Sequence, residues 1–331
     1  MKIFITGGAG FIGSHLAESY LAAGDEVVVL DDLSTGRREN LAAVLDHPRF
    51  TLLVGSVLDP EAVREASLGA DRAIHLAAAV GVRLVIDEPL RCLETNLRGT
   101  EVVVAEAARR KIPLFLASTS EVYGKNESVP FKEDSPSVIG STTISRWGYA
   151  CSKMIDEFLA LAYHRERGLP LVIGRFFNTV GPRQSARYGM VIPRFVEAAL
   201  AGRPLEVYGT GDQTRCFCDV SDVVRFVRAL LETPAAQGQV VNVGSDQPIS
   251  ILALAQKVVA RVSSSSSSPS SSKIRKVPYS VAFPHGFEDM LHRRPDIGRL
   301  REMTGLAPEI GLDEILDRVI REKGSTAAAA R

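Results

Sequence analysis

Three glycines at a spacing of three residues separate a strand-like run from a helix-like run early in the chain. KIFIT ends just before Gly7, and FIGSHLAESYLAAG follows Gly10 and includes Gly13. A strand, a tight turn and a helix in this order bring exposed backbone amides and the positive end of the helix to one point, which favours binding of a pyrophosphate. Glycine permits the tight turn and the close approach that a Cβ would block. The feature therefore predicts a dinucleotide-binding α/β fold.

The first half of the chain continues to alternate short β-rich runs with helical patterns. EVVVLD, FTLLVG, RAIHLAA, PLFLAS and LPLVIGRFF are typical of buried strands, and LRGTEVVVAEAARRK is typical of a helix. Such alternation predicts a Rossmann-type, doubly wound parallel sheet with helices on both faces.

The 331 residues are enough for one large or two modest domains. We expect residues 1–181 to form mainly the dinucleotide-binding domain. Residues 182–323, where the pattern is less regular, are expected to form mainly a smaller C-terminal substrate-binding lobe that is interleaved with it in space. The low-complexity run SSSSSSPSSS at 263–272 predicts a flexible loop, and GSTAAAAR at 324–331 predicts a tail outside the fold.

Charge and cysteine usage exclude several classes of protein. Thirty-nine basic residues balance thirty-nine acidic ones, so no overall field recruits nucleic acid or an anionic membrane. The sequence has neither a charged leader before an apolar run nor an apolar stretch of eighteen residues, which predicts a cytoplasmic protein without a membrane span. The cysteines follow neither a disulfide framework nor a metal-ligand spacing, so no metal is expected. They are Cys92, Cys151, Cys216 and Cys218.

An acidic residue ends the second predicted strand. Asp31 lies eighteen residues after Gly13, where a carboxylate accepts hydrogen bonds from the ribose hydroxyls of an adenosine. The same carboxylate repels a 2′-phosphate, so Asp31 predicts NAD in preference to NADP. Further cofactor contacts are expected from the glycine turn, the loop after Asp31 and the HLAA segment: Phe11, Ile12, Asp32, Ser34, Thr35, Gly36, Leu76, Ala77 and Ala78.

A tyrosine and a lysine lie four positions apart in the amphipathic pattern RWGYACSKMIDE at 146–157. This spacing puts Tyr149 and Lys153 on one face of a helix. An isolated pair of this kind is also typical of a solvated helix face with an aromatic anchor, so other motifs decide between a catalytic and a structural interpretation.

Five motifs in a fixed order resemble one superfamily. They are the GxxGxxG turn, HLAA at 75–78, STSEVYG at 118–124, Tyr149-x-x-x-Lys153 and RFFNTVGPR at 175–183. Together they resemble the extended short-chain dehydrogenase/reductases that act as nucleotide-sugar epimerases, dehydratases and decarboxylases, and the match spans nearly the whole chain. The resemblance implies an enzyme that uses NAD, takes a nucleotide sugar, with a UDP-sugar favoured, and forms a homodimer through helices that include the one with Tyr149.

The resemblance assigns Tyr149 the role of the base that removes the proton from the sugar 4-hydroxyl while hydride leaves C4. A free tyrosine has a pKa near ~10, so a base at neutral pH requires positive charges that stabilise the phenolate. Lys153 and the nicotinamide ring are expected to lower the pKa by about 3 units, which needs roughly 4 kcal/mol. Thr119 is expected to hydrogen-bond the same sugar hydroxyl; the alternative is an ordinary strand-end threonine.

The fate of the resulting 4-keto sugar depends on further groups. Ser120 and Glu121 follow Thr119 directly. An acid at this position indicates proton chemistry beyond C4, and the motif is similar to that of UDP-glucuronate decarboxylases and GDP-mannose 4,6-dehydratases. Alternatively, Glu121 orients the loop or a substrate hydroxyl.

Other segments favour the decarboxylase branch. SVIGSTTISRWGYACSK, GFEDMLHRRPDI and QTRCF resemble the decarboxylase domain of the bifunctional polymyxin-resistance enzyme and the plant UDP-apiose/UDP-xylose synthases. The resemblance places Arg293 at the reacting carboxylate, where oxidation at C4 creates a β-keto acid that loses carbon dioxide into the C4 carbonyl. RFFNTVGPR departs from that branch and looks epimerase-like; in epimerases a nearby arginine binds the diphosphate, which is the alternative role for Arg293.

Three residues are expected to hold the nucleotide. Arg215 is a planar donor suited to the diphosphate, with a surface ion pair as the alternative, and Asn178 is expected at the same phosphates. Tyr208 in PLEVYG is expected near the base, although an edge strand has a similar pattern. Ser56 replaces an aspartate that frequently contacts the adenine in the superfamily, so that contact stays open.

Three functions fit the sequence. The preferred prediction is a UDP-glucuronate decarboxylase, similar to UDP-xylose or UDP-apiose synthases. The second is a 4-epimerase of a UDP-hexose or UDP-hexuronate, or a 4,6-dehydratase of a sugar nucleotide. The third is a non-catalytic NAD-binding regulator, against which Thr119, Tyr149 and Lys153 argue, since a regulator needs no activated phenol.

Overall fold

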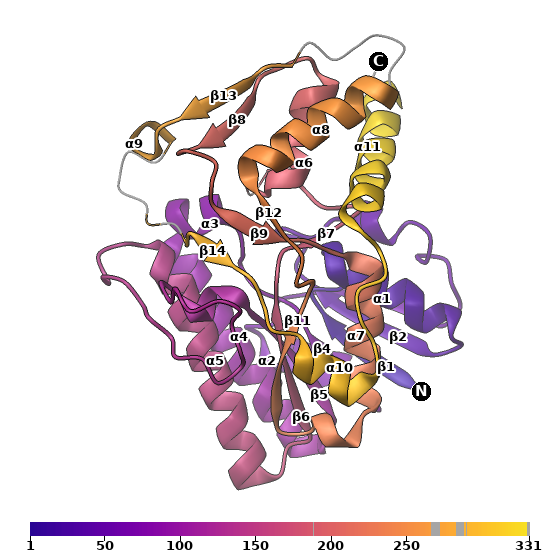
Figure 1. Ribbon diagram of the computed structural model, residues 1–331. Coiled ribbons are helices and arrows are strands. Elements are labelled where there is room, and N and C mark those ends of the chain that lie inside the picture. The colour runs from indigo at the N-terminus through magenta and orange to yellow at the C-terminus, as the bar shows by residue number, and fades with distance from the viewer. Residues whose placement is uncertain (188, 266–271, 283–287, 289, 330–331) are drawn as a thin grey trace.

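A seven-stranded parallel sheet forms the centre of the molecule (Figure 1). The computed structural model describes residues 1–187, 189–265, 272–282, 288 and 290–329. The strand order is β11-β6-β5-β4-β1-β2-β3, and each neighbouring pair is parallel. The strands are β1 Lys2–Thr6, β2 Glu26–Asp31, β3 Phe50–Val54, β4 Arg72–His75, β5 Leu114–Thr119, β6 Leu171–Phe176 and β11 Gln239–Val243. The predicted Rossmann-type sheet is confirmed.

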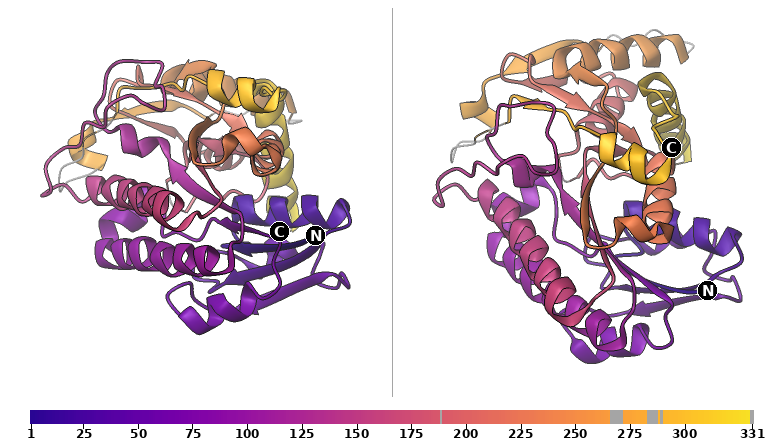
Figure 2. Two further views of the ribbon diagram at one scale, coloured as in Figure 1. Left: turned by 90° about the horizontal axis from the view of Figure 1, so that it is seen from below. Right: turned by 60° about the horizontal axis from the view of Figure 1, so that its bottom comes forward.

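Alternation along the strands lets helices cover both faces of this sheet. Ile3 and Ile5 of β1 belong to one buried apolar cluster, and Phe4 between them belongs to another. The first cluster includes residues of α1 Phe11–Ala22, α7 Val220–Glu232 and α10 Gly298–Thr304. The second includes residues of α2 Pro60–Ala66, α4 Pro89–Arg110 and α5 Arg146–Arg167, and Figure 2 shows α4 and α5 side by side on that face.

A smaller lobe lies above the carboxyl ends of the strands in the view of Figure 1. Its core packs α6 Val191–Leu200, α8 Ile251–Ser265 and α11 Leu312–Ala329 around side chains such as Phe195, Leu254 and Leu316. Short strands complete it: β7 Thr179–Val180 with β10 Cys218–Asp219, β8 Leu205–Tyr208 with β13 Ile274–Val277, and β9 Thr214–Cys216 between β12 Pro248–Ser250 and β14 His292–Arg293. The remaining elements are α3 Val82–Asp87, α9 Tyr279–Ala282, η1 Arg38–Leu41, η2 Ser120–Tyr123 and η3 Pro234–Ala236.

Segments beyond residue 181 contribute to both parts of the molecule. β11 pairs with β6 at the edge of the central sheet, and α7 and α10 pack on its face. Of the serine-rich run, residues 263–265 end α8, and 266–271 lie outside the described residues. α11 continues to Ala329, so residues 324–329 of the predicted tail are helical. Within the described ranges, no helix combines the length and the apolar character needed to cross a membrane.

Buried polar contacts fix α5 against the sheet. Glu157 of α5 accepts hydrogen bonds from Arg175 Nε at 2.9 Å and Arg175 Nη2 at 2.7 Å, and also from Ser118 Oγ. Ser118 lies on β5 and Arg175 on β6, so this forked, charge-assisted contact ties the helix to two adjacent strands. Because Thr119 ends β5 and Tyr149 lies on α5, the contact also sets the position of these two residues relative to each other.

Candidate active site

The glycine turn lies at the carboxyl end of β1, where the strand order reverses between β1 and β4. Such a reversal opens the crevice in which α/β sheets bind dinucleotides. Gly7 has a φ of 70°, and a Cβ there would lie 2.7 Å from Ala77 N. Gly10 is the N-cap of α1, so the first amides of the helix, those of Phe11, Ile12 and Gly13, have no intrahelical acceptor. The turn therefore offers donors and a positive helix end to a pyrophosphate.

Asp31 stands beside the turn at the end of β2. Its Oδ2 accepts from Ala9 N at 2.9 Å and its Oδ1 from Leu33 N at 2.9 Å. Gly36 packs against the carboxylate, since a Cβ on Gly36 would lie 2.7 Å from Asp31 Oδ1. Burial raises the pKa of Asp31, and hydrogen bonds from Leu33 and Ala9 oppose this. Each oxygen keeps a further lone pair, so two ribose hydroxyls can donate to a carboxylate that the backbone holds in place.

The other predicted cofactor contacts surround the same crevice. Asp32 Oδ1 accepts from Ser34 N at 2.9 Å, which forms the turn that continues through Thr35. Leu76 N donates to Thr6 O at 3.1 Å, and Ala77 N donates to Thr6 Oγ1 at 3.3 Å, so the HLAA segment, which continues to Ala78, is held beside β1. Ser56 accepts a hydrogen bond from Leu58 N at 3.2 Å within its own loop. A glycine cradle, a helix N-terminus and a ribose-binding carboxylate together fit NAD.

Sequence reasoning missed a residue that supports the glycine turn. Asn40 Nδ2 donates to Ala9 O at 2.8 Å, and Arg37 N donates to the same oxygen at 3.0 Å. Ala9 is thereby held on its N–H by Asp31 and on its carbonyl by the loop after β2. Nothing in the local pattern around Asn40 marks this role, because its partner lies 31 positions away.

Gly10 and Gly13 provide a matched pair of substitutions. A Cβ on Gly10 would have only Gly7 O within 4 Å, at 3.1 Å, whereas one on Gly13 would lie 2.6 Å from Gly8 Cα and would also meet Gly7 O. We expect Gly10→Ala to lose less stability than Gly13→Ala and to lose about tenfold or more in NAD affinity, because the methyl group occupies the approach of the pyrophosphate. Gly13→Ala should lose affinity and also about 1–3 kcal/mol of unfolding free energy. NAD titration and thermal unfolding measure both, and unchanged NAD affinity in Gly10→Ala would contradict this site.

Thr119 ends β5, and Tyr149 of α5 lies beside it. Thr119 is the N-cap of η2 and accepts from Glu121 N at 3.2 Å, and its side chain lies close enough to Tyr149 to act on the pKa of the phenol. The Tyr149 ring packs against a small apolar cluster that includes Leu84 of α3 and Cys92 of α4. Lys153 lies one helical turn further along α5. Lys153 is only 3% exposed, so the pair does not lie on a solvated helix face.

The residues of the chain alone do not lower the pKa of Tyr149. Burial raises it well above the ordinary range, the Glu121 carboxylate adds to the increase, and the hydrogen bond from Thr119 opposes it. The expectation that Lys153 strongly lowers the pKa of Tyr149 did not take into account Asp156, which lies on the same helix. Lys153 Nζ donates to Asp156 Oδ2 at 2.8 Å, and this pair is almost fully buried.

Glu121 lies within a cluster of arginines. Arg146 Nη2 donates to Glu121 Oε2 at 3.1 Å, and Arg293 Nη1 donates to Glu121 Oε1. Burial raises the pKa of Glu121, but the charges of Arg146, Arg293 and Arg215 outweigh it and bring the pKa to about 2. Arg293 Nε is buried and has no hydrogen-bond partner within the described part of the chain. The cluster carries an excess of positive charge and is suited to a second carboxylate or a phosphate.

Three of the other predicted site residues lie at or next to this cluster, and one lies further away; the three are Arg215, Asn178 and Ser120, and the fourth is Tyr208. Arg215 lies on β9 directly opposite Arg293 of β14, and its Nη1 donates to Thr214 O at 2.8 Å. Asn178 Oδ1 accepts from Arg293 Nη2 at 2.9 Å, and Ser120 is buried at the start of η2. Tyr208 is further along the lobe at the end of β8, under the guanidinium of Arg194 at 4.3 Å from the ring centroid.

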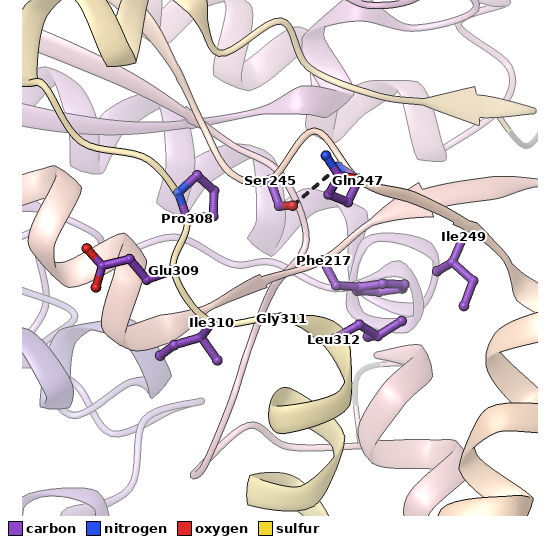
Figure 3. A pocket seen from close by; sticks show the side chains of 9 residues that line it. All are labelled: Phe217, Ser245, Gln247, Ile249, Pro308, Glu309, Ile310, Gly311 and Leu312. Carbon is purple, nitrogen blue, oxygen red and sulfur yellow. Dashed lines mark hydrogen bonds between the residues drawn. The ribbon is translucent and has the colours of Figure 1, made fainter.

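Two features of the structure lie apart from this chemistry. Among the described residues, no group of three or more His, Cys, Asp or Glu side chains is arranged to hold a metal ion. A small pocket is lined by Phe217, Gln247, Pro308 and Leu312, among others, where the lobe meets the start of α11 (Figure 3). None of the candidate site residues lines that pocket.

A Rossmann sheet with a glycine cradle, a ribose-binding carboxylate and a Thr-Tyr-Lys group defines the class of NAD-binding oxidoreductase-like enzymes. The chain matches the model of the NAD dependent epimerase/dehydratase family over residues 3–244, and it belongs to this family. The predicted enzyme class and the NAD cofactor are thereby confirmed.

The chain is similar to two decarboxylases and to one epimerase of solved structure. The chain is 39% identical to the UDP-N-acetyl-alpha-D-glucosaminuronate decarboxylase of Bacillus cytotoxicus, with 97% of each chain covered. It is 35% identical to UDP-glucuronic acid decarboxylase 1 of Arabidopsis thaliana, with 97% of this chain and 69% of that protein covered. The crystal structure of UDP-glucuronic acid 4-epimerase from Bacillus cereus, in complex with UDP-glucuronic acid and NAD, superposes with a TM-score of 0.85 at 27% identity, over 98% of this chain and 100% of that one.

Proposed function

We propose that this enzyme is an NAD-dependent decarboxylase of a UDP-linked hexuronic acid and that it acts through a 4-keto intermediate. The observation that carries this proposal is the arginine cluster around Glu121, in which Arg293 and Arg146 are paired with a carboxylate beside Tyr149. Guanidinium groups that already hold one carboxylate in a partly buried site have the geometry to hold a substrate carboxylate. The sequence similarity to two uronic acid decarboxylases supports the same substrate class.

The reaction begins at the sugar 4-hydroxyl. Tyr149 Oη takes the hydroxyl proton, and Thr119 holds the same oxygen by a hydrogen bond. NAD held by the glycine turn and Asp31 would supply the acceptor for the hydride from C4 and the source of the hydride that is returned at the end of the cycle. Lys153 stabilises the phenolate, and the positive charge of an oxidised nicotinamide is required in addition, because the chain alone raises the pKa of Tyr149.

Loss of carbon dioxide follows from the ketone at C4. The C5–C6 bond breaks, its electron pair moves into the C4 carbonyl as an enolate, and Tyr149 and Thr119 donate hydrogen bonds to that oxygen. Arg293 holds the departing carboxylate so that the breaking bond is aligned with the carbonyl π system. C5 then takes up a proton, and C4 is reduced as Tyr149 returns its proton to the oxygen.

Ser120 and Glu121 are the proposed route for the proton at C5. With a pKa of about 2, Glu121 is ionised at neutral pH while Arg146, Arg293 and Arg215 stabilise its negative charge against burial. A substrate carboxylate that takes over Arg293 weakens that stabilisation, so the pKa of Glu121 rises and the residue can carry a proton. This change in pKa gives the contact between Glu121 and the positively charged arginines a role in catalysis.

A 4-epimerase of a UDP-hexuronate is the second candidate. It is favoured by the superposition on a UDP-glucuronic acid 4-epimerase. In that reaction the 4-keto sugar keeps its carboxylate, turns over in the site and is reduced on its other face. The two candidates share every residue up to the ketone and differ only in the breaking of the C5–C6 bond.

Mass spectrometry of the products tests the proposal. The purified enzyme is incubated with UDP-glucuronate, UDP-N-acetylglucosaminuronate, UDP-glucose and a GDP-hexose. We expect one of the two uronates to lose the mass of carbon dioxide and the neutral hexoses to stay unchanged. A uronate that is converted with no change of mass would establish the epimerase instead, and loss of water would establish a dehydratase.

We propose further that the enzyme works in the cytoplasm as a homodimer built on α4 and α5. These helices lie side by side on one face of the sheet (Figure 2). Leu90, Ile155 and Phe158 on them expose 69%, 52% and 68% of their surface, and exposed large apolar residues on adjacent helices are typical of an interface. Sedimentation of the purified protein measures the oligomeric state.

A further inference from the structure

Asn242 connects three segments that lie far apart in the sequence. It lies on β11 and is fully buried. Its Oδ1 accepts a hydrogen bond from Tyr123 Oη at 2.7 Å. Its Nδ2 donates to Phe131 O at 2.9 Å and to Asp296 O at 3.1 Å. Because a carbonyl oxygen only accepts, these partners fix the orientation of the amide, and both of its N–H groups are used.

The segment that follows Arg293 is held by these contacts. Phe131 N donates to Arg294 O at 2.8 Å, and Asp296 N donates to Phe131 O at 2.8 Å, so Phe131 forms a short parallel bridge with this segment. Asn242 donates to two carbonyls of the bridge, those of Phe131 and Asp296. Arg293 itself pairs with β9. Its backbone is therefore fixed by that pairing and, directly after it, by the bridge that Asn242 holds together.

The short helix that carries Glu121 is held by the same asparagine. Tyr123 is the last residue of η2, two positions after Glu121. Its ring is buried and stacks on Phe131, with the ring centroids 4.7 Å apart, and its hydroxyl donates to Asn242. Asn242 therefore links the helix that carries Glu121 to the segment that follows Arg293. Glu121 and Arg293 are the two residues whose side chains pair in the arginine cluster.

Asn242 is itself anchored at the edge of the central sheet. Its backbone N–H donates to Glu133 Oε1 at 2.9 Å, and it lies opposite Arg175 of β6. Arg175 Nη1 donates to Glu133 O at 2.9 Å, and its guanidinium pairs with Glu157 of α5. Each side-chain donor and acceptor of Asn242 thus has a partner, and a buried polar network that is satisfied in this way favours a single arrangement.

We propose that Asn242 is a positioning residue that sets the selectivity for a substrate carboxylate by holding Arg293 in register with Glu121. The inference rests on the proposed function, in which Arg293 holds the carboxylate of a hexuronate. Asn242 is fully buried, so it acts through the segment after Arg293 and not by contact with the sugar. A guanidinium binds a carboxylate through two parallel hydrogen bonds, which require a fixed plane and distance. A small shift of Arg293 therefore weakens binding of a uronate more than binding of a neutral hexose.

Calorimetric binding of matched ligand pairs tests the proposal. The NAD-loaded enzyme is titrated with UDP-glucuronate and UDP-glucose, and with UDP-N-acetylglucosaminuronate and UDP-N-acetylglucosamine, in a Tyr149→Phe background so that no ligand is consumed. The selectivity is the ratio of the affinity for the uronate to the affinity for its neutral partner. In Asn242→Ala we expect the selectivity for the accepted uronate to fall about fivefold to tenfold, with the affinity for the neutral sugar within about twofold of the parent value. The reason is the loss of three hydrogen bonds that join the two segments.

Arg293→Met in the same titrations shows whether Asn242 acts through Arg293. Alone, it should remove most of the selectivity. In the Arg293→Met background, Asn242→Ala should change the selectivity no further, because two residues that act as one unit are not additive. If Arg293→Met leaves the selectivity unchanged, the proposed function fails and this inference fails with it. If Arg293→Met lowers the selectivity and Asn242→Ala does not, or if the double variant loses still more, the inference alone is overturned.

Tyr123→Phe is a milder variant of the same contact. It removes the hydroxyl that donates to Asn242 Oδ1 and keeps the ring that stacks on Phe131. We expect the selectivity to fall about twofold to threefold, since the two carbonyls that Asn242 holds keep their bonds. This variant keeps the inference testable if Asn242→Ala does not fold, and an unchanged selectivity in it would then overturn the inference.

Asp222→Ala is the matched control for a loss of stability alone. Asp222 of α7 is also buried, and it also fixes a distant segment, because it accepts hydrogen bonds from Glu309 N at 3.1 Å and from Ile310 N at 3.0 Å. Its substitution should lower the unfolding temperature and leave the selectivity unchanged. Unfolding reduces the number of sites that are titrated, whereas it does not change the ratio of two affinities. A selectivity that falls as far in Asp222→Ala as in Asn242→Ala overturns the inference.

Discussion

Replacing Tyr149 with phenylalanine is expected to reduce carbon dioxide release from the uronate substrate by about 1,000-fold or more. The substitution removes the hydroxyl that takes the proton from O4, and general acid–base catalysis contributes about 10²–10⁴-fold in enzymes. The sugar oxygen then keeps Thr119 as its single partner. Affinity for the UDP-sugar should change little, since the arginine cluster is intact. Product mass spectrometry and calorimetric binding measure the two effects separately.

Tyr20→Phe is the control for this substitution. Tyr20 of α1 is also a buried tyrosine, 1% exposed, and it belongs to the apolar cluster on the far side of the sheet from α5. It should retain full activity. A Tyr149→Phe enzyme with activity within about tenfold of the parent would show that another group removes the proton, since a tenfold change corresponds to only ~1.4 kcal/mol of barrier.

Replacing Arg293 with methionine is expected to weaken binding of the uronate by about 30-fold or more and to reduce carbon dioxide release to a similar or greater extent. Removing one partner of a buried, charge-assisted contact costs about 2–5 kcal/mol. Arg293 is partly buried, with its side chain 12% exposed, and it contacts both Glu121 and Asn178. Arg293→Lys should recover only part of the loss, because an ammonium lacks the planar fork of the guanidinium.

The comparison of two ligands separates the two roles considered for Arg293. If Arg293 binds the carboxylate, affinity for UDP-glucuronate falls while affinity for UDP-glucose changes little. If it binds the diphosphate, both affinities fall equally, and the decarboxylase proposal loses its main support. Arg294→Met is the matched control. Arg294 is exposed, and its Nε donates a hydrogen bond to Asp246 O at 3.1 Å.

The parts of the fold and of the site that could be predicted best from the sequence are those whose geometry depends on local spacing. The glycine turn, Asp31 and the Tyr149–Lys153 pair each depend on a strand end or on one helical face, and a single stretch of chain fixes their geometry. Strand alternation likewise predicted the central sheet. β11 was not predicted. It is a short strand that follows a long segment in the smaller lobe, and its local sequence does not indicate that it joins the edge of the central sheet.

Long-range contacts in the site could not be predicted in the same way. Arg146 contacts Glu121 from 25 positions away and Arg293 contacts it from 172 positions away, and an arginine beside an aromatic residue in a helix has many ordinary uses. Asp156 is a different case. It lies three positions after Lys153, and opposite charges at this spacing on one helix attract, so the sequence contained the signal that the lysine charge is partly cancelled.

The central claim is that one reversible oxidation at C4 leads to loss of the uronate carboxylate. The most direct measurement uses UDP-glucuronate, and in parallel UDP-N-acetylglucosaminuronate, carrying deuterium at C4. The account predicts that the product of the accepted substrate has lost carbon dioxide and still carries the deuterium at C4, because the hydride that leaves is the one that returns. A product that keeps its carboxylate, or one that has lost carbon dioxide with the deuterium exchanged for hydrogen from solvent, would contradict it.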